Sequence, residues 1–127
     1  MRVLLDTQIF LILTQQGIED VSSRVRKVVQ DEDSELLLSA VSITEMAVKA
    51  SISKLAITAP DLSKAAEDLR LTLIPFEARH AIRMFDLPLH HRDPFDRMLV
   101  ATALSEGVPM ITSDEQLKRY RGLKVIS

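Results

Sequence analysis

The sequence contains no cysteine, and it has only three glycines among its 127 residues. The absence of cysteine excludes disulfide bonds and thiolate metal ligands, and it is typical of proteins from a reducing compartment. We therefore expect a cytoplasmic protein. The chain shows no Gly/Ser-rich linker, no internal repeat and no tract of low complexity. A chain of this length without a linker predicts one domain over residues 1–127.

Aromatic residues are also scarce, at 4% of the chain, whereas hydrophobic residues make up 46%. The core must therefore be built from Leu, Ile, Val, Ala and Met. No apolar run is long enough for a signal sequence or a membrane span. A net charge of −2 argues against a strong basic field that would hold nucleic acid. One local basic cluster, more simply explained as a solvated surface, contains Lys118, Arg119, Arg121 and Lys124.

Short apolar runs alternate with helical stretches along the chain. We expect strands at residues 3–5, 35–39, 71–74, 108–112 and 124–126. Apolar spacing and helix-start signals predict helices at residues 7–13, 18–30, 42–53, 60–70, 77–85, 93–106 and 113–120. Each predicted strand is almost wholly apolar, which indicates a parallel sheet covered on both faces. We predict an α/β fold, a three-layer α/β/α sandwich around a central, mainly parallel sheet.

Three sequence patterns predict where helices begin. Ser42 precedes Glu45 by three residues and Ser113 precedes Gln116 by three, as in a capping box. Asp93 is followed by proline, and Pro at the first helical position loses no needed N–H. Capping therefore gives these residues a sufficient structural role, whether or not they take part in chemistry.

Four acidic residues lie just after predicted strands or in the first turns of predicted helices: Asp6, Glu45, Asp96 and Asp114. Ligands bind beyond the carboxyl ends of strands in open parallel sheets, so we expect these carboxylates to converge there. Any one of them is explained equally well by the helix dipole or by capping. Asp96 fits that explanation less well, because Leu99 and Val100 put it on an apolar helix face. A charge on such a face needs a partner or a metal.

Asp6 raises the same problem at the end of a central strand, and no basic residue is an obvious partner for both carboxylates. An all-oxygen site suits Mg²⁺ or Mn²⁺ better than zinc. A bound cation of this kind promotes phosphodiester hydrolysis by activating water and by stabilising charge on the phosphate and the leaving oxygen. Thr112 and Ser113 are accessory candidates that would orient a carboxylate or the water.

Four stretches of the sequence resemble, in order, the signature segments of PIN-domain proteins. They are LLDT at 4–7, SAVSITEMAVK at 39–49, HRDPFDRMLVA at 91–101 and ITSDE at 111–115. Together they span essentially the entire chain, and they are most similar to VapC-type toxins of bacterial type II toxin–antitoxin pairs. The resemblance implies a Mg²⁺- or Mn²⁺-dependent endoribonuclease. Its catalytic and metal-binding residues would be Asp6, Glu45, Asp96 and Asp114, with Asp93 as an accessory.

The same resemblance implies several partners. It predicts an RNA substrate, a homodimer, and a VapB-type antitoxin whose C-terminal segment blocks the pocket. It predicts contact with DNA only through that antitoxin, and no contact with membranes. Many relatives have His after the Asp-Thr pair, whereas this chain has Gln8, which leaves the acids intact but affects substrate contacts or fine geometry.

The basic side chains and histidines have less distinct interpretations. His80, His90 and His91 show no metal-ligand spacing, and we expect them at exposed loop or helix positions. Arg92 and Arg97 flank the start of the 93–106 helix. They are expected either to contact RNA phosphate or to pair with acids such as Asp93 and Glu106 on the surface.

Two other functions remain as alternatives. A signalling receiver domain also has an acidic Mg²⁺ pocket at its strand ends. It would need an Asp ending a middle strand and a Lys ending the last one, whereas here Ile74-Pro75 ends the middle strand and Lys124 precedes the last. The other alternative is a catalytically idle binding module whose acids only cap helices, and which would depend little on Mg²⁺.

Overall fold

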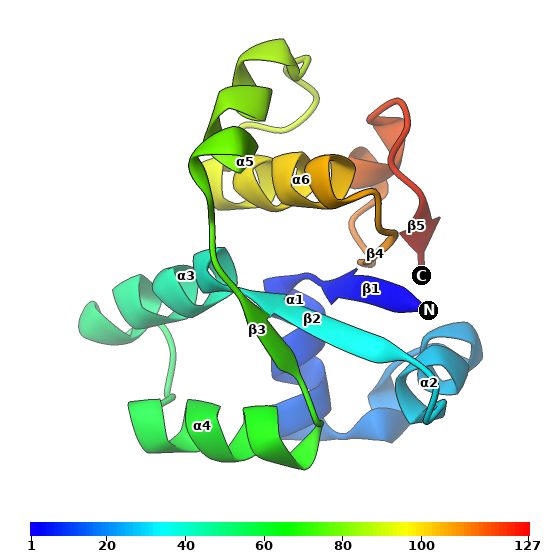
Figure 1. Cartoon of the computed structure of the whole chain (residues 1–127). Helices are drawn as coiled ribbons and strands as arrows, with labels where there is room; N and C mark the ends of the chain where they lie inside the picture. Colours follow the sequence, from blue (N-terminus) through cyan, green and yellow to red (C-terminus); the bar gives the residue numbers. More distant parts are fainter.

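The computed structural model describes all 127 residues and shows a five-stranded sheet between two layers of helices (Figure 1). The strands are β1 (Arg2–Leu5), β2 (Glu35–Ser39), β3 (Thr72–Ile74), β4 (Met110–Ile111) and β5 (Val125–Ile126). Their order is β3-β2-β1-β4-β5, and every neighbouring pair is parallel. The predicted α/β/α sandwich is therefore confirmed, and its sheet is wholly parallel.

The helical segments connect the strands and cover both faces of the sheet. They are α1 (Thr7–Leu11), the π-helical turn η1 (Ile12–Gln16), η2 (Ile18–Asp20), α2 (Ser23–Gln30), α3 (Ala40–Ser51), α4 (Ala59–Asp68), α5 (Ala78–Arg83), η3 (Met84–Asp86), α6 (Pro94–Glu106) and η4 (Glu115–Arg119). Helices α5 and α6 lie on one side of the sheet, and α1, α2 and α4 lie on the other (Figure 1). None of the helices combines the length and apolar character that crossing a bilayer requires.

The central strand β1 is buried on both faces. Successive side chains of a strand point to opposite faces. Leu4 accordingly belongs to the core cluster that contains Leu99 of α6, whereas Val3 and Leu5 belong to the cluster that contains Ile9 of α1. The side chains of all three strand residues are inaccessible to solvent. The carboxyl end of β1 therefore delivers the next residue, Asp6, into the middle of the sheet edge.

Two predicted helix starts are wrong, and both errors concern residues near the acidic cluster. Ser39, the last residue of β2, caps α3 by accepting a hydrogen bond from the Val41 N–H at 3.0 Å. Because the chain turns directly from strand into helix, Ser42 and Glu45 lie inside α3 and are buried. Asp114, rather than Ser113, caps η4. The serine patterns were misleading because the cap belongs to the residue with extended backbone at the strand exit.

The amphipathic stretch predicted as one helix over residues 18–30 is divided. Residues Ile18–Asp20 form the short η2, and α2 begins at Ser23 with Ser22 as its cap. The Ser22 hydroxyl accepts the Val25 N–H at 3.1 Å, which gives the chain a favourable new start after an extended residue. The apolar periodicity of the sequence continues through this break, so the periodicity did not show that the helix is divided.

His80 is completely buried between α5 and α6, contrary to the expectation of an exposed position. Its Nδ1 accepts the Glu77 N–H at 3.0 Å, so its Nε2 carries the hydrogen and donates to Glu106 Oε1 at 2.9 Å. Arg79 also pairs with Glu106. Burial opposes ionisation of Glu106, but the His80 hydrogen bond and the Arg79 charge outweigh it and lower the pKa of that carboxyl. These contacts fasten α5 to the C-terminal half of α6.

The burial of the strands predicts unequal effects of truncating two leucines. Leu4→Ala should lower the free energy of unfolding by about 2–5 kcal/mol, because it leaves a cavity in the centre of the sheet. Leu73→Ala on the edge strand β3, where the side chain is 52% exposed, should cost less than about 1 kcal/mol. Urea denaturation of both variants measures the difference. Equal losses would contradict the placement of β1 at the centre and β3 at the edge.

Candidate active site

The carboxyl edge of the sheet gathers all four of the acids expected there. Asp6 follows β1, and Asp114 follows β4 after two residues. Glu45 lies in the second turn of α3, and Asp96 in the first turn of α6. The negative charges of Asp114 and Glu45 act on Asp6, and those of Glu45 and Asp6 act on Asp96. The four carboxylates therefore form one electrostatically connected group, here called the acidic pocket.

Asp6 is the most buried aspartate of the pocket, with 5% of its surface exposed. Its Oδ1 accepts the Ile9 N–H at 2.7 Å and thereby caps α1. Burial raises the pKa of Asp6 to about 6, even though hydrogen bonds from the Thr112 hydroxyl and the Ile9 N–H lower it. The Thr112 hydroxyl also accepts the Asp114 N–H at 3.1 Å. Thr112, an expected accessory residue, thus connects two acids of the pocket.

Asp96 is half-buried, and burial raises its pKa to about 6. The charge of Asp93 contributes to this increase, whereas His91 lowers the pKa. Asp93 itself caps α6, since its Oδ1 accepts the N–H groups of Phe95 and Asp96 at 2.8 and 3.2 Å. Two carboxyl groups with raised pKa values show that the pocket resists holding its negative charges without a compensating cation.

Helix capping and participation in the pocket do not exclude each other. Asp6 and Asp114 each use Oδ1 to cap a helical segment. The Oδ2 of Asp114 instead faces the centre of the pocket, where it contacts His91. Glu45 and Asp96 cap no helix. Capping therefore accounts for one oxygen of Asp6 and one oxygen of Asp114, and it does not explain why all four acids lie together.

Glu45 has a set of hydrogen-bond partners that the sequence did not reveal. Its Oε1 is 2.7 Å from the Thr7 hydroxyl, which is 2.9 Å from the Ser42 hydroxyl. A carboxylate only accepts, so Thr7 donates to Glu45 and accepts from Ser42. Lys49 pairs with Oε2 at 2.7 Å, and this hydrogen bond raises the pKa of Lys49. The spacing of Ser42, Glu45 and Lys49 along one helix face was the available signal.

His91 also lies in the pocket, although we expected an exposed position. Its Nε2 is 2.9 Å from Asp114 Oδ2 and 3.3 Å from Asp96 Oδ2. The side chain is 18% exposed. The only sequence signal was the position of His91 two residues before Asp93, at the start of the segment that carries Asp93 and Asp96. Histidine spacing was uninformative because the partners of His91 are carboxylates rather than other histidines.

The two arginines near the start of α6 differ in their contacts. The Arg97 guanidinium donates to the Pro88 carbonyl at 2.9 Å and to the Leu87 carbonyl and the Tyr120 hydroxyl at 3.4 Å. The expected pairing of Arg97 with a surface acid is therefore wrong, because backbone carbonyls of the preceding loop satisfy its guanidinium. Arg92 is exposed and forms no hydrogen bond or ion pair with the chain, so its phosphate contact stays a prediction.

The remaining two residues named from the sequence are exposed. Ser113 lies at the surface and makes no hydrogen bond through its side chain. Gln8, which stands where many relatives have His, is also exposed. Neither one contributes to the hydrogen bonds that hold the acidic pocket.

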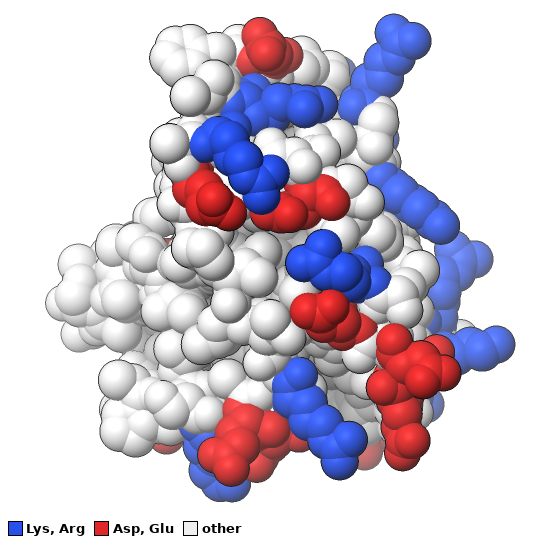
Figure 2. Space-filling view, viewed as in Figure 1, with Lys and Arg blue, Asp and Glu red and all other residues white.

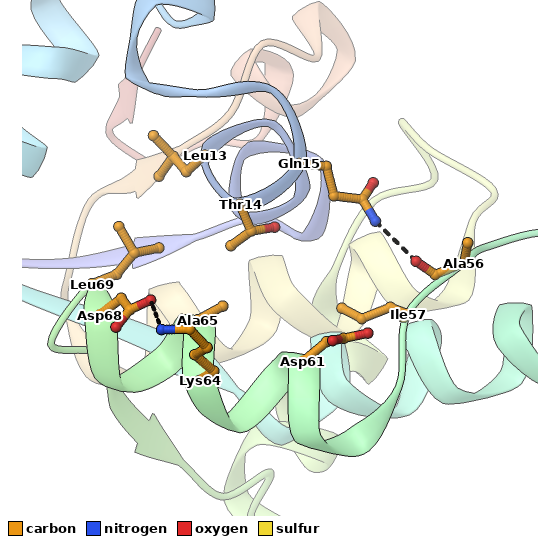
Figure 3. Close-up of a pocket in the computed structure, with 10 residues that line it drawn as sticks. All are labelled: Leu13, Thr14, Gln15, Ala56, Ile57, Asp61, Lys64, Ala65, Asp68 and Leu69. Atoms are coloured by element: carbon orange, nitrogen blue, oxygen red, sulfur yellow. Dashed lines mark hydrogen bonds and ion pairs between the residues drawn. The ribbon is translucent and has the colours of Figure 1, made fainter.

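A separate cleft of about 420 Å³ lies between η1 and α4 (Figure 3). Its polar groups already have partners within the chain. Gln15 donates to the Ala56 carbonyl at 3.2 Å, and Lys64 pairs with Asp68 at 3.0 Å. No residue of the acidic pocket lines this cleft. It is therefore a concave surface without converging reactive groups, and the chemistry is assigned to the acidic pocket.

The fold and the pocket define an α/β protein with a carboxylate cluster at the carboxyl edge of a parallel sheet. The chain belongs to the PIN domain family, whose family model matches residues 3–123. Comparison with curated protein sequences gave no match.

The fold is similar to that of solved toxin–antitoxin complexes. The VapBC2 structure from Rickettsia felis, bound to a promoter DNA fragment, matches with a TM-score of 0.76 and 18% identity over 99% of this chain and 98% of that one. DNA-bound VapBC from Salmonella typhimurium matches with a TM-score of 0.69 and 18% identity over 99% and 97% of the two chains. VapBC-1 from nontypeable Haemophilus influenzae matches with a TM-score of 0.69 and 16% identity over 100% of this chain and 98% of that one. At these identities the likeness establishes the fold.

The raised pKa of Asp6 predicts how stability depends on pH. The carboxyl ionises at about pH 6 in the folded chain, against an ordinary value of 3.8. Its contribution to stability is therefore complete below about pH 4 and is lost as the pH rises through about 6. In metal-free buffer, Asp6 should contribute a loss of the order of 2–3 kcal/mol to the pH dependence of the parent, and Asp6→Asn should lack this share and keep only the loss caused by Asp96.

Chemical denaturation between about pH 4 and 7 measures this difference. Asp20→Asn, which changes an exposed acid outside the pocket, should retain the pH dependence of the parent. Identical pH profiles for the parent and Asp6→Asn would show that burial of Asp6 has no energetic cost.

Proposed function

We propose that this protein is a Mg²⁺- or Mn²⁺-dependent endoribonuclease that acts as the VapC-type toxin of a toxin–antitoxin pair. The convergence of Asp6, Glu45, Asp96 and Asp114 in one pocket carries this proposal. Among these acids, only Glu45 has a lysine or arginine partner. Membership of the PIN domain family supports the same function.

The donor set fits a divalent cation. Asp6 and Asp96 are the proposed direct ligands, because burial makes their ionisation unfavourable until a cation compensates the charge. Glu45 and Asp114 complete the set, and Asp93 is an accessory that places Asp96 by capping α6. When bound, the cation would activate water and stabilise negative charge on the phosphate and on the leaving oxygen.

Other side chains have proposed roles around this centre. Lys49 holds Glu45 and presents a positive charge at the pocket, where an incoming phosphate would be attracted. Thr112 orients Asp6 and Asp114 through its hydroxyl. Ser113 is exposed next to Asp114 and is proposed to orient the attacking water. Arg92, which has no partner within the chain, is a proposed contact for RNA phosphate.

The positive charge of the surface supports an RNA substrate. Figure 2 shows a series of Lys and Arg side chains along the right edge of the molecule, over the C-terminal segment. This segment includes η4, which directly follows Asp114 of the pocket. We propose that RNA bound at the pocket extends along this C-terminal segment toward Lys118, Arg119, Arg121 and Lys124, although the overall charge is −2. The preference for RNA over DNA rests on the family resemblance alone.

The proposed biological role includes an antitoxin of the VapB type. The similar solved structures are VapBC complexes, and two of them are bound to DNA. We propose that residues 1–127 act as one nuclease domain, that a C-terminal segment of the antitoxin blocks its pocket, and that DNA is contacted only through the antitoxin. The lack of cysteine agrees with a cytoplasmic location for this pair.

The two alternative functions account for the structure less well. A receiver domain has the strand order 2-1-3-4-5, whereas this sheet has the order β3-β2-β1-β4-β5. An idle module in which acids only cap helices leaves Glu45 and Asp96 unexplained, because neither caps a helix. The raised pKa of Asp96 is a cost that such a module would have no reason to retain.

The nuclease activity predicts a specific effect of Asp96→Asn. This nearly isosteric change removes a proposed metal ligand, so Mn²⁺- or Mg²⁺-dependent cleavage of structured RNA should fall at least about a hundredfold. Mg²⁺ should raise the melting temperature of the parent, because it binds the folded state, but should have little effect on the variant. Cleavage of labelled RNA on gels and thermal melts with and without chelator measure the two effects.

Asp20→Asn is the matched control, because it removes an exposed acid outside the pocket. It should retain the activity and the Mg²⁺-dependent melting shift of the parent. Should Asp96→Asn cleave RNA as fast as the parent, the assignment of the site would fail.

We also propose a homodimer, formed through exposed apolar side chains near α5. Phe85 is 91% exposed, and Ile82 and Leu89 are 65% and 69% exposed. Clustered apolar side chains in contact with water favour burial against a partner, and a second copy of the chain supplies the same surface. Phe85→Ser should convert the dimer to a monomer at micromolar concentration, as measured by analytical ultracentrifugation.

Leu73→Ser is the matched control, because it changes an exposed apolar side chain on the edge strand β3 instead. It should leave the dimer intact. A monomeric parent, or a Phe85→Ser variant that remains dimeric, would contradict this interface.

A further inference from the structure

The hydrogen bonds of His91 fix which of its ring nitrogens carries the hydrogen. Its Nδ1 is 3.0 Å from the backbone nitrogen of Asp93 and accepts that N–H. A backbone N–H can only donate, so Nδ1 must be the nitrogen without hydrogen. Its Nε2 therefore carries an N–H, and this N–H lies 2.9 Å from Asp114 Oδ2 and 3.3 Å from Asp96 Oδ2. His91 therefore donates a hydrogen bond to one proposed metal ligand, Asp114, and lies within ion-pair distance of a second, Asp96.

This arrangement is opposite to that of a histidine that binds a metal. A metal-binding histidine directs a lone pair at the metal and donates its other N–H to a nearby acceptor. In His91 the outer nitrogen accepts and the inner nitrogen donates. The ligand atoms of His91, Asp96 and Asp114 lie within 4.8 Å of one another, which resembles a metal site. The direction of the hydrogen bonds nevertheless makes the imidazole a hydrogen-bond donor to the carboxylates rather than a metal ligand.

The loop that carries His91 is held in place by contacts outside the pocket. Arg97 donates to the carbonyl oxygens of Leu87 and Pro88. The neighbouring His90 packs edge-on against Tyr120, with 5.0 Å between ring centroids. These contacts set the path of the loop, so the position of His91 does not depend only on its attraction to the carboxylates.

We propose that His91 competes with the divalent cation for Asp96 and Asp114. Its Nε2–H donates to Asp114 Oδ2 and lies beside Asp96 Oδ2, so a cation that binds both of these oxygens must displace this N–H. An interaction that stabilises only the cation-free protein lowers the affinity for the cation by the same free energy. His91 thus sets the cation concentration at which the pocket fills. The inference rests on the proposed function, because it takes Asp96 and Asp114 as ligands.

Metal binding tests this proposal independently of RNA cleavage. Calorimetric titration with Mn²⁺ at a fixed pH of about 7.5 should give a Kd for His91→Ala that is roughly three- to tenfold lower than that of the parent. Asp20→Asn is the control, since it changes an exposed side chain outside the pocket and leaves the loop of His91 intact, and it should bind Mn²⁺ like the parent. An unchanged or higher Kd for His91→Ala would overturn the proposal, because a ligand or a bystander gives those results.

The unmodified protein provides a second test that does not depend on the folding of a variant. In metal-free protein, the ¹⁵N chemical shifts of the His91 ring should show hydrogen on Nε2 and none on Nδ1. Saturating Mg²⁺ should shift the His91 Nε2 resonance strongly and the His90 resonances little. A hydrogen on Nδ1 in the metal-free protein, or a His91 Nε2 resonance that ignores Mg²⁺, would also overturn the proposal.

The failure of this inference is distinguishable from the failure of the proposed function. If the parent binds Mn²⁺ and Asp96→Asn does not, the cation site stands. An unchanged or higher Kd for His91→Ala would then overturn only the role of His91. If the parent binds no Mn²⁺ at millimolar concentration, the nuclease proposal and the competition proposal both fail.

Discussion

The removal of carboxylates from water at the carboxyl end of β1 is the constraint on which the rest of this structure depends. Asp6 leaves a strand that is covered on both faces, so water cannot solvate its charge freely. Asp96 adds a second carboxylate, and burial raises the pKa values of both to about 6. The surrounding backbone N–H groups, hydroxyls and His91 reduce this cost without removing it.

The fold supports these charges through the helices that start at the pocket. Asp6, Asp93 and Asp114 cap α1, α6 and η4, so the positive ends of these helical segments face the carboxylates. Each capping bond satisfies one carboxylate oxygen and leaves the other available. Asp6 and Asp114 thus stabilise the starts of helical segments and also contribute carboxylate oxygens to the acidic pocket. A parallel sheet brings this about because its helices all begin near the carboxyl edge.

Two side chains at the border of the pocket, Lys49 and His91, contact the carboxylates in different ways. Lys49 compensates Glu45 permanently through an ion pair on the same helix. His91 is neutral, donates a hydrogen bond to Asp114 and lies 3.3 Å from Asp96, and we propose that a bound cation replaces these contacts. The pocket therefore combines one fixed positive charge with one exchangeable donor. In the proposed function, the first would attract phosphate and the second would leave room for the metal.

The sequence by itself determined the five strands, the layered fold and the identity of the four acids, because apolar runs and strand-end positions are local properties. It left undecided which of these acids cap helices and which do not. It also misplaced the starts of α3 and η4. The positions of His80 and His91 and the partners of Arg97 and Glu45 came only from the tertiary structure. The contacts of Glu45 with Thr7, His80 with Glu106, His91 with Asp114 and Arg97 with Pro88 join residues 9 to 38 positions apart along the chain. Such distances leave no periodic pattern in a sequence. Local patterns record which face a side chain occupies, whereas only folding decides which side chain it meets.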